Sequence, residues 1–384
     1  MGSIGRRKRA GGFVWDARWR DPDGRQRKKA FARRIDAERF LTTISADVLR
    51  GDYVDPNDPT TVREYAEAWR EAQVHRPTTR AHVETNLRRH VYPYFGDRRL
   101  SSVRPGEIQA WISRLTRQLS PATVQVIHGI LAAIYKAAIR DRLVNSSPCQ
   151  GTKLPKRLPV EVTPPTTTIV HALTDAVPER YRALIVLAAG TGMRQGECFG
   201  LDTDHIDLDN HSLRVEQQLV LLPYRDPFLG PPKTPASHRT IPLPDVVVEA
   251  MARHLERFPV QRPDRLIFTD DDGNALRRTR FSREVWQPAV AAAGARRATG
   301  FHDLRHYYAS LLIRHGESVK TVQRRLGHAT AAETLDTYAH LWPDSDERTR
   351  EAIDAVLRAP RHERPSTQAA PPSRPGSAQD SPTR

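Results

Sequence analysis

The sequence predicts a mainly α-helical protein with small β-sheets, an α+β class in which three domains follow one another along the chain. Apolar residues recur at helical spacing over most of the 384 residues. Strand patterns bounded by turn residues are confined to two stretches, near 13–31 and 204–241. We expect the following division: a sheet module at 1–55, a helical domain at 60–147, a linker at 148–167, a mixed domain at 168–358 and a disordered tail at 359–384.

The charge of the chain indicates a polyanionic partner. It carries 60 Lys and Arg against 45 Asp and Glu, a formal net charge of +15, and residues 1–50 hold 14 of the basic residues against 6 acidic ones. Double-stranded DNA is the first candidate. No apolar run approaches the roughly 20 residues that a membrane span requires, and no apolar segment follows the basic N-terminus. We therefore expect a cytoplasmic protein without a membrane partner.

Residues 1–55 are predicted to form a small sheet backed by one helix. Apolar and polar residues alternate from Phe13 to Arg20, Asp21-Pro22-Asp23-Gly24 suits a type I turn, and a very basic strand follows at 25–31. A twisted sheet of this kind fits a DNA groove, whereas the alternative is a basic edge that is only solvated. The candidate DNA-binding residues are Arg18, Arg20, Arg25, Arg27 and Lys29.

The two following domains differ in their patterns. Thr61 and Glu64 have capping-box spacing at the start of the helical domain, and Ser120-Pro121 starts its last helix. Prolines mixed with basic residues predict an extended linker. In the third domain we expect helices near 168–190 and 194–201, a three-strand stretch near 204–241 and a run of helices to about 357.

Two motifs of the third domain suggest other chemistries and are rejected. The glycines at 190, 192 and 196 lack the spacing of a dinucleotide-binding loop and follow a helical pattern where a strand is required. His302 and His306 are four residues apart, as in a zinc-protease helix, but Asp303 is one methylene too short and Arg305 would place a cation beside the metal. We expect no cofactor and no metal ion.

Six cationic or protic residues are spread in order through the third domain. They are Arg194 after Thr191-Gly192, Lys233 among prolines, the pair His302 and Arg305, His328 after Gly327, and Tyr338 ten residues further on. The series resembles the catalytic signature of the tyrosine recombinases, also called phage integrases. The resemblance implies a three-stranded arm-type DNA-binding module, an all-α core-binding domain and a mixed α/β catalytic domain.

The chemistry of a phosphodiester explains these residue types. Its displacement transition state concentrates negative charge on oxygen, which Arg194 and Arg305 would bind in the place of a metal ion. Tyr338 would be the nucleophile, with its phenolate favoured by the two guanidiniums and His302 helping to take its proton. By resemblance, Lys233 protonates the leaving 5′-hydroxyl, His328 hydrogen-bonds the phosphate, and a 3′-phosphotyrosine retains the bond energy without ATP or metal.

The resemblance further implies a site-specific recombinase that integrates and excises a phage or another mobile element. Its expected partners are double-stranded DNA at core and arm sites, three more copies of itself in a tetramer, a host DNA-bending protein and an excision factor. The last helix, near 344–358, would dock on a neighbouring protomer; the alternative is packing on its own domain. A DNA-binding regulator that lost its chemistry and a type IB topoisomerase are the rival functions, although none of the six residues is degraded.

Overall fold

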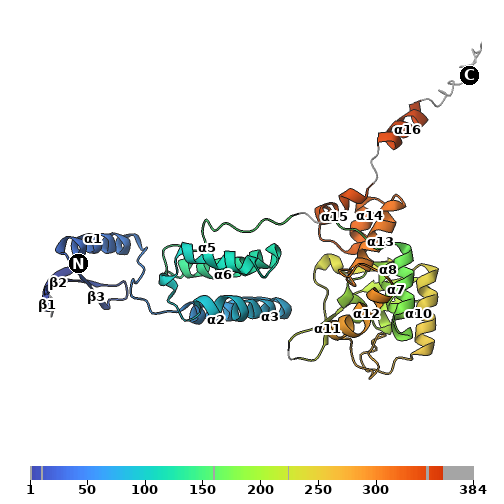
Figure 1. Ribbon diagram of the computed structural model, residues 1–384, viewed down its shortest axis with the longest axis horizontal. Helices are drawn as coiled ribbons and strands as arrows, with labels where there is room; N and C mark the ends of the chain where they lie inside the picture. The colour runs from blue at the N-terminus through green and yellow to red at the C-terminus, as the bar shows by residue number, and fades with distance from the viewer. Residues whose placement is uncertain (1, 10–11, 159–160, 224, 343–345, 358–384) are drawn as a thin grey trace, which may run out of the picture.

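The computed structural model describes residues 2–9, 12–158, 161–223, 225–342 and 346–357. These residues form helices with three small antiparallel sheets (Figure 1), so the predicted α+β class is confirmed. The expected disordered tail at 359–384 lies outside the described residues. Separate buried apolar clusters occur in the N-terminal module, in the helical domain and in the third domain.

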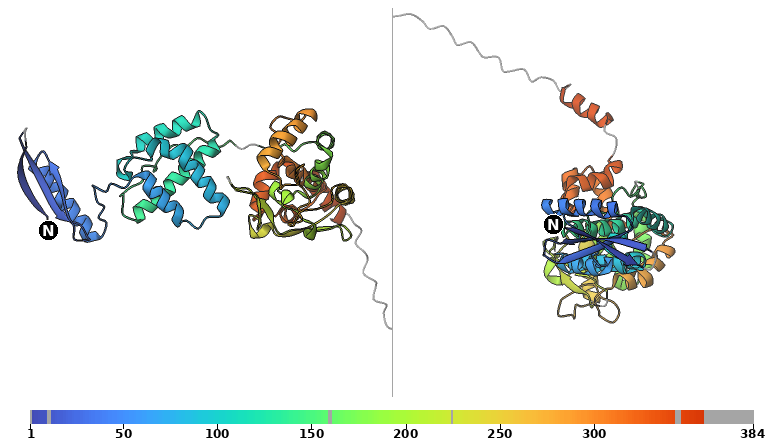
Figure 2. Two further views of the ribbon diagram at one scale, coloured as in Figure 1. Left: turned by 90° about the horizontal axis from the view of Figure 1, so that it is seen from below. Right: turned by 90° about the vertical axis from the view of Figure 1, so that its left-hand side faces the viewer.

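The N-terminal module is a three-stranded sheet with one helix across a single face (Figures 1 and 2). Its strands β1 (Ser3–Arg9), β2 (Gly12–Arg20) and β3 (Gln26–Phe31) pair antiparallel in this order, and α1 (Arg34–Arg50) packs against them. The small core contains Trp19, whose indole N–H donates to the hydroxyl of Tyr53 at 2.9 Å. One face of the sheet therefore stays free of the helix.

The helical domain is built around α6 (Pro121–Arg140). Its other helices are α2 (Val62–Ala72), α3 (Pro77–Asn86), a π-helical turn (Leu87–Val91), α4 (Tyr92–Phe95) and α5 (Pro105–Thr116). The predicted capping box is confirmed: Thr61 accepts from the backbone of Glu64 at 3.2 Å, and the Glu64 carboxylate accepts from the backbone of Thr61 at 2.9 Å. By length and composition α6 could cross a membrane, but its apolar side forms the core of this domain.

The segment between the helical domain and α7 (Thr167–Ala176) has no helix or strand in its described part from 153 onward, and both of its ends are anchored. Gln109 hydrogen-bonds the backbone of Lys153, at 2.8 and 3.2 Å, and Gln125 donates to the carbonyl of Pro155 at 2.8 Å. At the other end, the carbonyl of Val162 lies 2.9 Å from Nε2 of His340.

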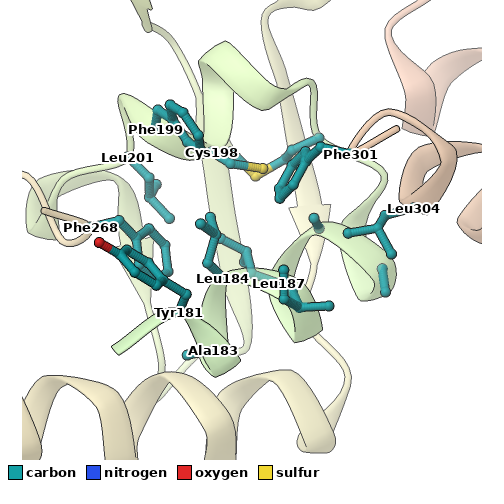
Figure 3. Close-up of a cluster of buried hydrophobic side chains, with 14 of the residues drawn as sticks. Tyr181, Ala183, Leu184, Leu187, Cys198, Phe199, Leu201, Phe268, Phe301 and Leu304 are labelled. Atoms are coloured by element: carbon teal, nitrogen blue, oxygen red, sulfur yellow. The ribbon is translucent and has the colours of Figure 1, made fainter. Parts of the chain in front are cut away.

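The third domain packs its helices around α8 (Glu179–Thr191), whose side chains are buried along almost its whole length (Figure 3). The predicted three-strand stretch instead contains five short strands in two sheets, because turns interrupt it repeatedly. Strands β4 (Ile206–Asp207), β5 (Ser212–Val215) and β8 (Arg239–Pro242) form one sheet, and β6 (Gln218–Val220) with β7 (Phe228–Gly230) forms a hairpin.

The rest of this domain is mostly helical. Its remaining helices are α9 (Gln195–Phe199), α10 (Asp245–Arg257), α11 (Arg278–Phe281), a π-helical turn (Ser282–Trp286), α12 (Gln287–Ala292), α13 (Asp303–Arg314), α14 (Val319–Leu326), α15 (Ala331–Tyr338) and α16 (Asp346–Leu357). Phe199 and Phe301 pack edge-on, 6.0 Å apart, and join α9 to the start of α13. This packing fixes the two segments that carry the candidate arginines.

We predict that Leu131→Ala, at a fully buried position of α6, destabilises the helical domain by about 2–5 kcal/mol, because it leaves a cavity in the core. Hydrogen exchange followed by mass spectrometry measures this as faster exchange in peptides from 62–140. The matched control is Val126→Ala on the same helix, where the side chain is 40% exposed. Equal protection in the two variants would contradict the packing described here.

Candidate active site

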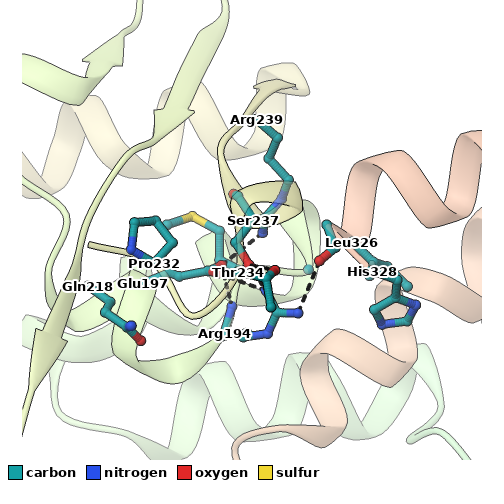
Figure 4. A network of polar contacts seen from close by, with 12 residues as sticks. Arg194, Glu197, Gln218, Pro232, Thr234, Ser237, Arg239, Leu326 and His328 are labelled. Carbon is teal, nitrogen blue, oxygen red and sulfur yellow. Dashed lines mark hydrogen bonds and ion pairs between the residues drawn. The ribbon is translucent and has the colours of Figure 1, made fainter. Parts of the chain in front are cut away.

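Arg194 is placed by a sharp change of chain direction after α8. The helix ends at Gly192, whose φ is +64°, and a Cβ there would lie 2.4 Å from Cδ1 of Tyr308. Glycine is therefore required both by the left-handed backbone and by the close neighbour. Arg194 then caps the start of α9 and points toward the loop before β8 (Figure 4).

A buried carboxylate holds Arg194 in place. Glu197 is 1% exposed; it accepts from the backbone N–H of Arg194 at 2.9 Å, from Nη1 of Arg194 at 3.0 Å and from Nη2 of Arg239 at 2.8 Å (Figure 4). Burial by itself raises the pKa of Glu197, but the guanidiniums of Arg239 and Arg194 outweigh it and lower the pKa below its usual value. Glu197 is thus an ionised anchor for two arginines.

The same arginine is linked to the loop of Lys233. Ser237 is fully buried; its hydroxyl accepts from Nη1 of Arg194 at 3.1 Å and lies 2.9 Å from the hydroxyl of Thr234. Lys233 precedes Thr234 and is exposed, three residues beyond the hairpin strand β7. Within the described ranges its ammonium group makes no hydrogen bond or ion pair, and it lines a cavity of about 850 Å³ with Arg76, Arg277 and Arg278.

Arg305 is a buried cation whose hydrogen bonds, within the described residues, all go to backbone carbonyls. It is 2% exposed and donates to the carbonyl of Gly192 and to that of Leu326, both at 2.7 Å. Burial, followed by the nearby charges of Arg194 and Arg239, lowers its pKa to about 9, so it remains charged at neutral pH. In the parts of the chain that are described, no carboxylate bonds to this guanidinium. Its charge is available to an incoming anion.

Two of the expected histidines border these arginines. His302 has a solvent-accessible side chain at the start of α13, but the protein surrounds it on most sides; this desolvation, with His306 and the two arginines, lowers its pKa to about 4. His328 is 7% exposed, and its Nδ1 lies 2.9 Å from the hydroxyl of Thr334. Burial and the arginines lower the pKa of His328 to about 3. Both imidazoles are neutral at pH 7.

Tyr338 ends α15 with its side chain only 1% exposed. Its hydroxyl oxygen lies 2.8 Å from Nδ1 of His306, and its ring stacks parallel to that of His328 at a centroid distance of 6.4 Å. Burial raises the pKa of Tyr338 to about 12 and outweighs the lowering by Arg305. Arg305 thus favours the phenolate, as expected, but in the protein without DNA burial has the larger effect and the hydroxyl stays protonated.

The five candidate residues of the N-terminal sheet do not share one face. Arg18 and Arg20 lie on the open face, where Lys28 is the cross-strand partner of Arg18. Arg27 lies on the helix side and pairs with two carboxylates, Asp21 at 3.0 Å and Asp55 at 2.9 Å. The other two are Lys29, whose ammonium lies 4.9 Å from the ring centre of Phe40, and Arg25, which is exposed in the turn before β3.

Comparison with known proteins supports the sequence signature. Residues 60–154 match the phage integrase central domain, and residues 166–344 match the phage integrase family. The chain is 30% identical over 340 residues to the prophage phiRv2 integrase of Mycobacterium tuberculosis, a match that covers 85% of this chain and 88% of the relative. The chain belongs to the phage integrase family of tyrosine-type site-specific DNA recombinases.

Solved structures share the fold of this recombinase. The Tn1549 transposon integrase in complex with transposon right end DNA superimposes with a TM-score of 0.66 at 20% identity, covering 78% of this chain and 100% of that one. A lambda integrase tetramer bound to a Holliday junction gives a TM-score of 0.58 at 18% identity, covering 86% and 93%. At such identities the likeness is one of fold.

The structure brings Arg194, His302, Arg305, His328 and Tyr338 of the recombinase to one site and leaves Lys233 on an exposed neighbouring loop. It adds three residues that the sequence analysis did not assign to the site: Arg239, Ser237 and His306. Only His306 had a signal, its helical spacing from His302, and that spacing suggested a metal site. Arg239 and Ser237 follow a loop whose path the sequence does not reveal.

We predict that Glu197→Gln destabilises the recombinase by about 3–5 kcal/mol, because it leaves the buried Arg239 and the partly buried Arg194 without their counter-charge. Since the folded pKa of Glu197 is lowered, its stabilisation is present above the unfolded pKa and is lost as the pH falls through the folded pKa. Thermal unfolding between neutral and acid pH should show this loss in wild type and not in the variant.

The matched control for this prediction is Glu249→Gln, which removes an exposed partner of Arg253 at 3.7 Å. A surface pair of this kind contributes about 1 kcal/mol or less. Equal stability of the two variants would show that the Glu197 carboxylate does not hold the site together.

Proposed function

We propose that this recombinase integrates and excises a phage or another mobile element by cutting and rejoining double-stranded DNA through a 3′-phosphotyrosine on Tyr338. The observation that carries the proposal is the excess of positive charge around His302 and His328, in the site that also holds Tyr338. The guanidiniums of Arg194, Arg239 and Arg305 are buried or half-buried there; among the described residues Glu197 pairs with Arg194 and Arg239, and Arg305 bonds to backbone carbonyls.

Such a site is suited to a phosphodiester. Arg239 and Glu197 neutralise each other closely, which leaves Arg194 and Arg305 as donors for the non-bridging oxygens. Guanidiniums that are fixed before the reaction stabilise the negative charge that develops in the transition state, because they need no reorganisation. We therefore expect the arginines to provide the charge stabilisation that metal ions provide in other phosphoryl-transfer enzymes, and the reaction to proceed in EDTA.

The leaving 5′-oxygen needs a proton, which we assign to Lys233. Its loop is joined to the arginine site through Thr234 and Ser237, so phosphate binding at Arg194 would bring the loop to the scissile bond. His328 would donate a hydrogen bond from Nε2 to the phosphate, because Nδ1 is engaged with Thr334. The tyrosyl phosphate keeps the energy of the broken bond, and a second 5′-hydroxyl can then reverse the reaction.

We predict that wild type forms a covalent protein–DNA adduct in EDTA with a nicked duplex that spans the junction of the element, and that Tyr338→Phe does not. The phenyl ring keeps the packing but removes the nucleophile. Denaturing gels measure the adduct, and a gel shift confirms that both proteins bind the duplex. Binding without an adduct in wild type would favour a DNA-binding regulator.

Plasmid relaxation separates the recombinase from a type IB topoisomerase. A topoisomerase would relax supercoiled DNA that lacks any partner site, whereas the proposed recombinase requires two sites. Integration of a conjugative element would use the same chemistry on a different DNA. The sequence of the cleaved junction shows whether the integrated DNA belongs to a conjugative element or to a phage.

The N-terminal module supports a second DNA contact, at arm sites. Arg18, Arg20 and Lys28 project from the sheet face that α1 leaves open, and Arg7 lies on the same face. The helical domain would contribute to core-site binding together with the catalytic domain, since Arg76 and Lys233 line one cavity between them. We further propose that the recombinase acts in the bacterial cytoplasm, with a host DNA-bending protein and an excision factor.

The last helix supports assembly on DNA as a homotetramer. In Figure 1 and in the right-hand view of Figure 2, α16 extends away from the catalytic domain. Its residues Ile353 and Leu357 are 55% and 77% exposed, so their apolar surface is not covered by their own domain. This arrangement favours docking on a neighbouring protomer over packing in cis.

We predict that Ile353→Ser combined with Leu357→Ser leaves DNA binding and adduct formation intact but weakens tetramer formation at least tenfold, because burial of two large aliphatic side chains contributes about 3–6 kcal/mol. Sedimentation on two-site DNA measures the assembly. The control is Val246→Ser on α10, an aliphatic residue that is 61% exposed. Unchanged tetramers in the double variant, or deletion of 344–384 without effect, would contradict trans docking.

A further inference from the structure

The hydroxyl of Tyr338 has one side-chain partner among the described residues, and it is not the expected one. Nδ1 of His306 lies 2.8 Å from this oxygen, and the two rings meet edge to face at a centroid distance of 5.6 Å. His302, which the sequence suggested as the proton acceptor, contacts the ring of His306 edge-on at 4.9 Å. Within the described chain no hydrogen bond joins His302 to Tyr338.

We propose that His306 is a catalytic residue of this recombinase, the group that takes the proton from Tyr338 when the tyrosine attacks the phosphate. The inference rests on the proposed function and assigns a residue to its first chemical step. Three placements support it: hydrogen-bond contact with the reacting oxygen, a position directly after the phosphate-binding Arg305, and a half-buried ring that keeps bulk water away.

The proton balance of the step is simple. As Tyr338 Oη bonds to phosphorus, its proton passes to Nδ1 of His306; the bond from phosphorus to the 5′-oxygen breaks, and that oxygen takes a proton from Lys233. In the joining step each transfer runs backwards, so His306 returns its proton to the departing tyrosine. In the interval the imidazolium would donate to the bridging oxygen of the phosphotyrosine, which an aliphatic neighbour could not do.

The surroundings of His306 keep its imidazole neutral, so that it can accept a proton. Burial lowers its pKa and Arg305 lowers it further, while Asp303 raises it, with the net result that the ring is neutral at pH 7. A neutral imidazole that accepts at Nδ1 carries its proton on Nε2. The other titratable groups near the pair are His302 and His328, both neutral, and Glu333, which acts on Tyr338.

This assignment leaves His302 free for another task. Its accessible ring lies at the start of α13 beside Arg194 and Arg305, where it can donate to an oxygen of the bound phosphate. Two histidines one helical turn apart would then have different roles: His306 would accept the proton of the nucleophile, and His302 would hydrogen-bond the phosphate.

Single-turnover cleavage of the nicked junction duplex in EDTA tests the proposal with His306→Gln. We expect cleavage to slow on the order of 10²- to 10⁴-fold, the usual contribution of a general base. His315→Gln, at the far end of the same helix and exposed, is the matched control and should cleave at the wild-type rate. Wild-type rates in His306→Gln would overturn the proposal.

A second substrate shows on which side of the reaction His306 acts. When sulfur replaces the bridging 5′-oxygen, the leaving group departs as a thiolate and needs no proton. Lys233→Ala should therefore recover much of its lost rate on this substrate, whereas His306→Gln should remain slow on both duplexes. Recovery of His306→Gln by the bridging sulfur would place the histidine on the leaving-group side and overturn the assignment.

A third measurement separates proton transfer from loss of folding. Replacing Tyr338 by 3,5-difluorotyrosine supplies a more acidic hydroxyl, which should reduce the defect of His306→Gln at least tenfold if the histidine removes a proton. An undiminished defect, with DNA binding and hydrogen-exchange protection as in wild type, would show a purely structural role and overturn the proposal. If wild type itself forms no adduct, the proposed function fails and the assignment of His306 fails with it. If wild type forms the adduct and His306→Gln forms it at the same rate, the assignment fails and the proposed function stands.

Discussion

The buried carboxylate of Glu197 is the interaction on which the rest of the site depends. It binds Arg194 through backbone and side chain and binds Arg239 from the strand that follows the Lys233 loop. Without it, guanidiniums would repel one another in a region that excludes water, and no neutral residue could replace the missing charge. One anion thus allows a cluster of cations to exist inside the fold before any DNA arrives.

The second constraint is that Tyr338, the proposed nucleophile, is held in its protonated form. Burial holds the hydroxyl of Tyr338 protonated, and Arg305 alone does not overcome that effect. A bound phosphate would reduce the help from Arg305 further, since it neutralises the same charge. For the proposed reaction, loss of the proton from Tyr338 would therefore have to accompany attack and would need a proton acceptor. The side chain that contacts the hydroxyl then matters more than the number of arginines in the site.

The sequence predicted much of this arrangement and missed a specific part of it. Helices with clear apolar stripes, such as α6, and ends marked by capping residues, such as Thr61, follow from local periodicity. The five short strands between 206 and 242 do not, because segments of two to four residues carry too little pattern to separate from turns. The partners of Arg194 and Tyr338 are tertiary contacts, and sequence spacing gives no measure of them.

The sheet module shows a similar limit in another form. The sequence identified a strongly basic strand, yet neighbouring residues of a strand point to opposite faces, so Arg27 and Lys28 have different surroundings. The net charge of a strand does not tell on which face of the sheet each basic side chain lies. The pairing register determines the face of each side chain. The register is fixed by the packing of Trp19 against the helix that covers this side of the sheet.

The anchored linker has a mechanical consequence. From Pro155, held by the helical domain, to Val162, held by His340, the chain has seven residue steps, which stretch to about 25 Å at most. While both anchors hold, this length limits how far the two domains could separate around a duplex. If they move apart beyond that length, one anchor has to release, and His340, which holds Val162, is two residues after Tyr338. Separation of the two domains would thus apply tension to the segment that carries Tyr338, the proposed nucleophile.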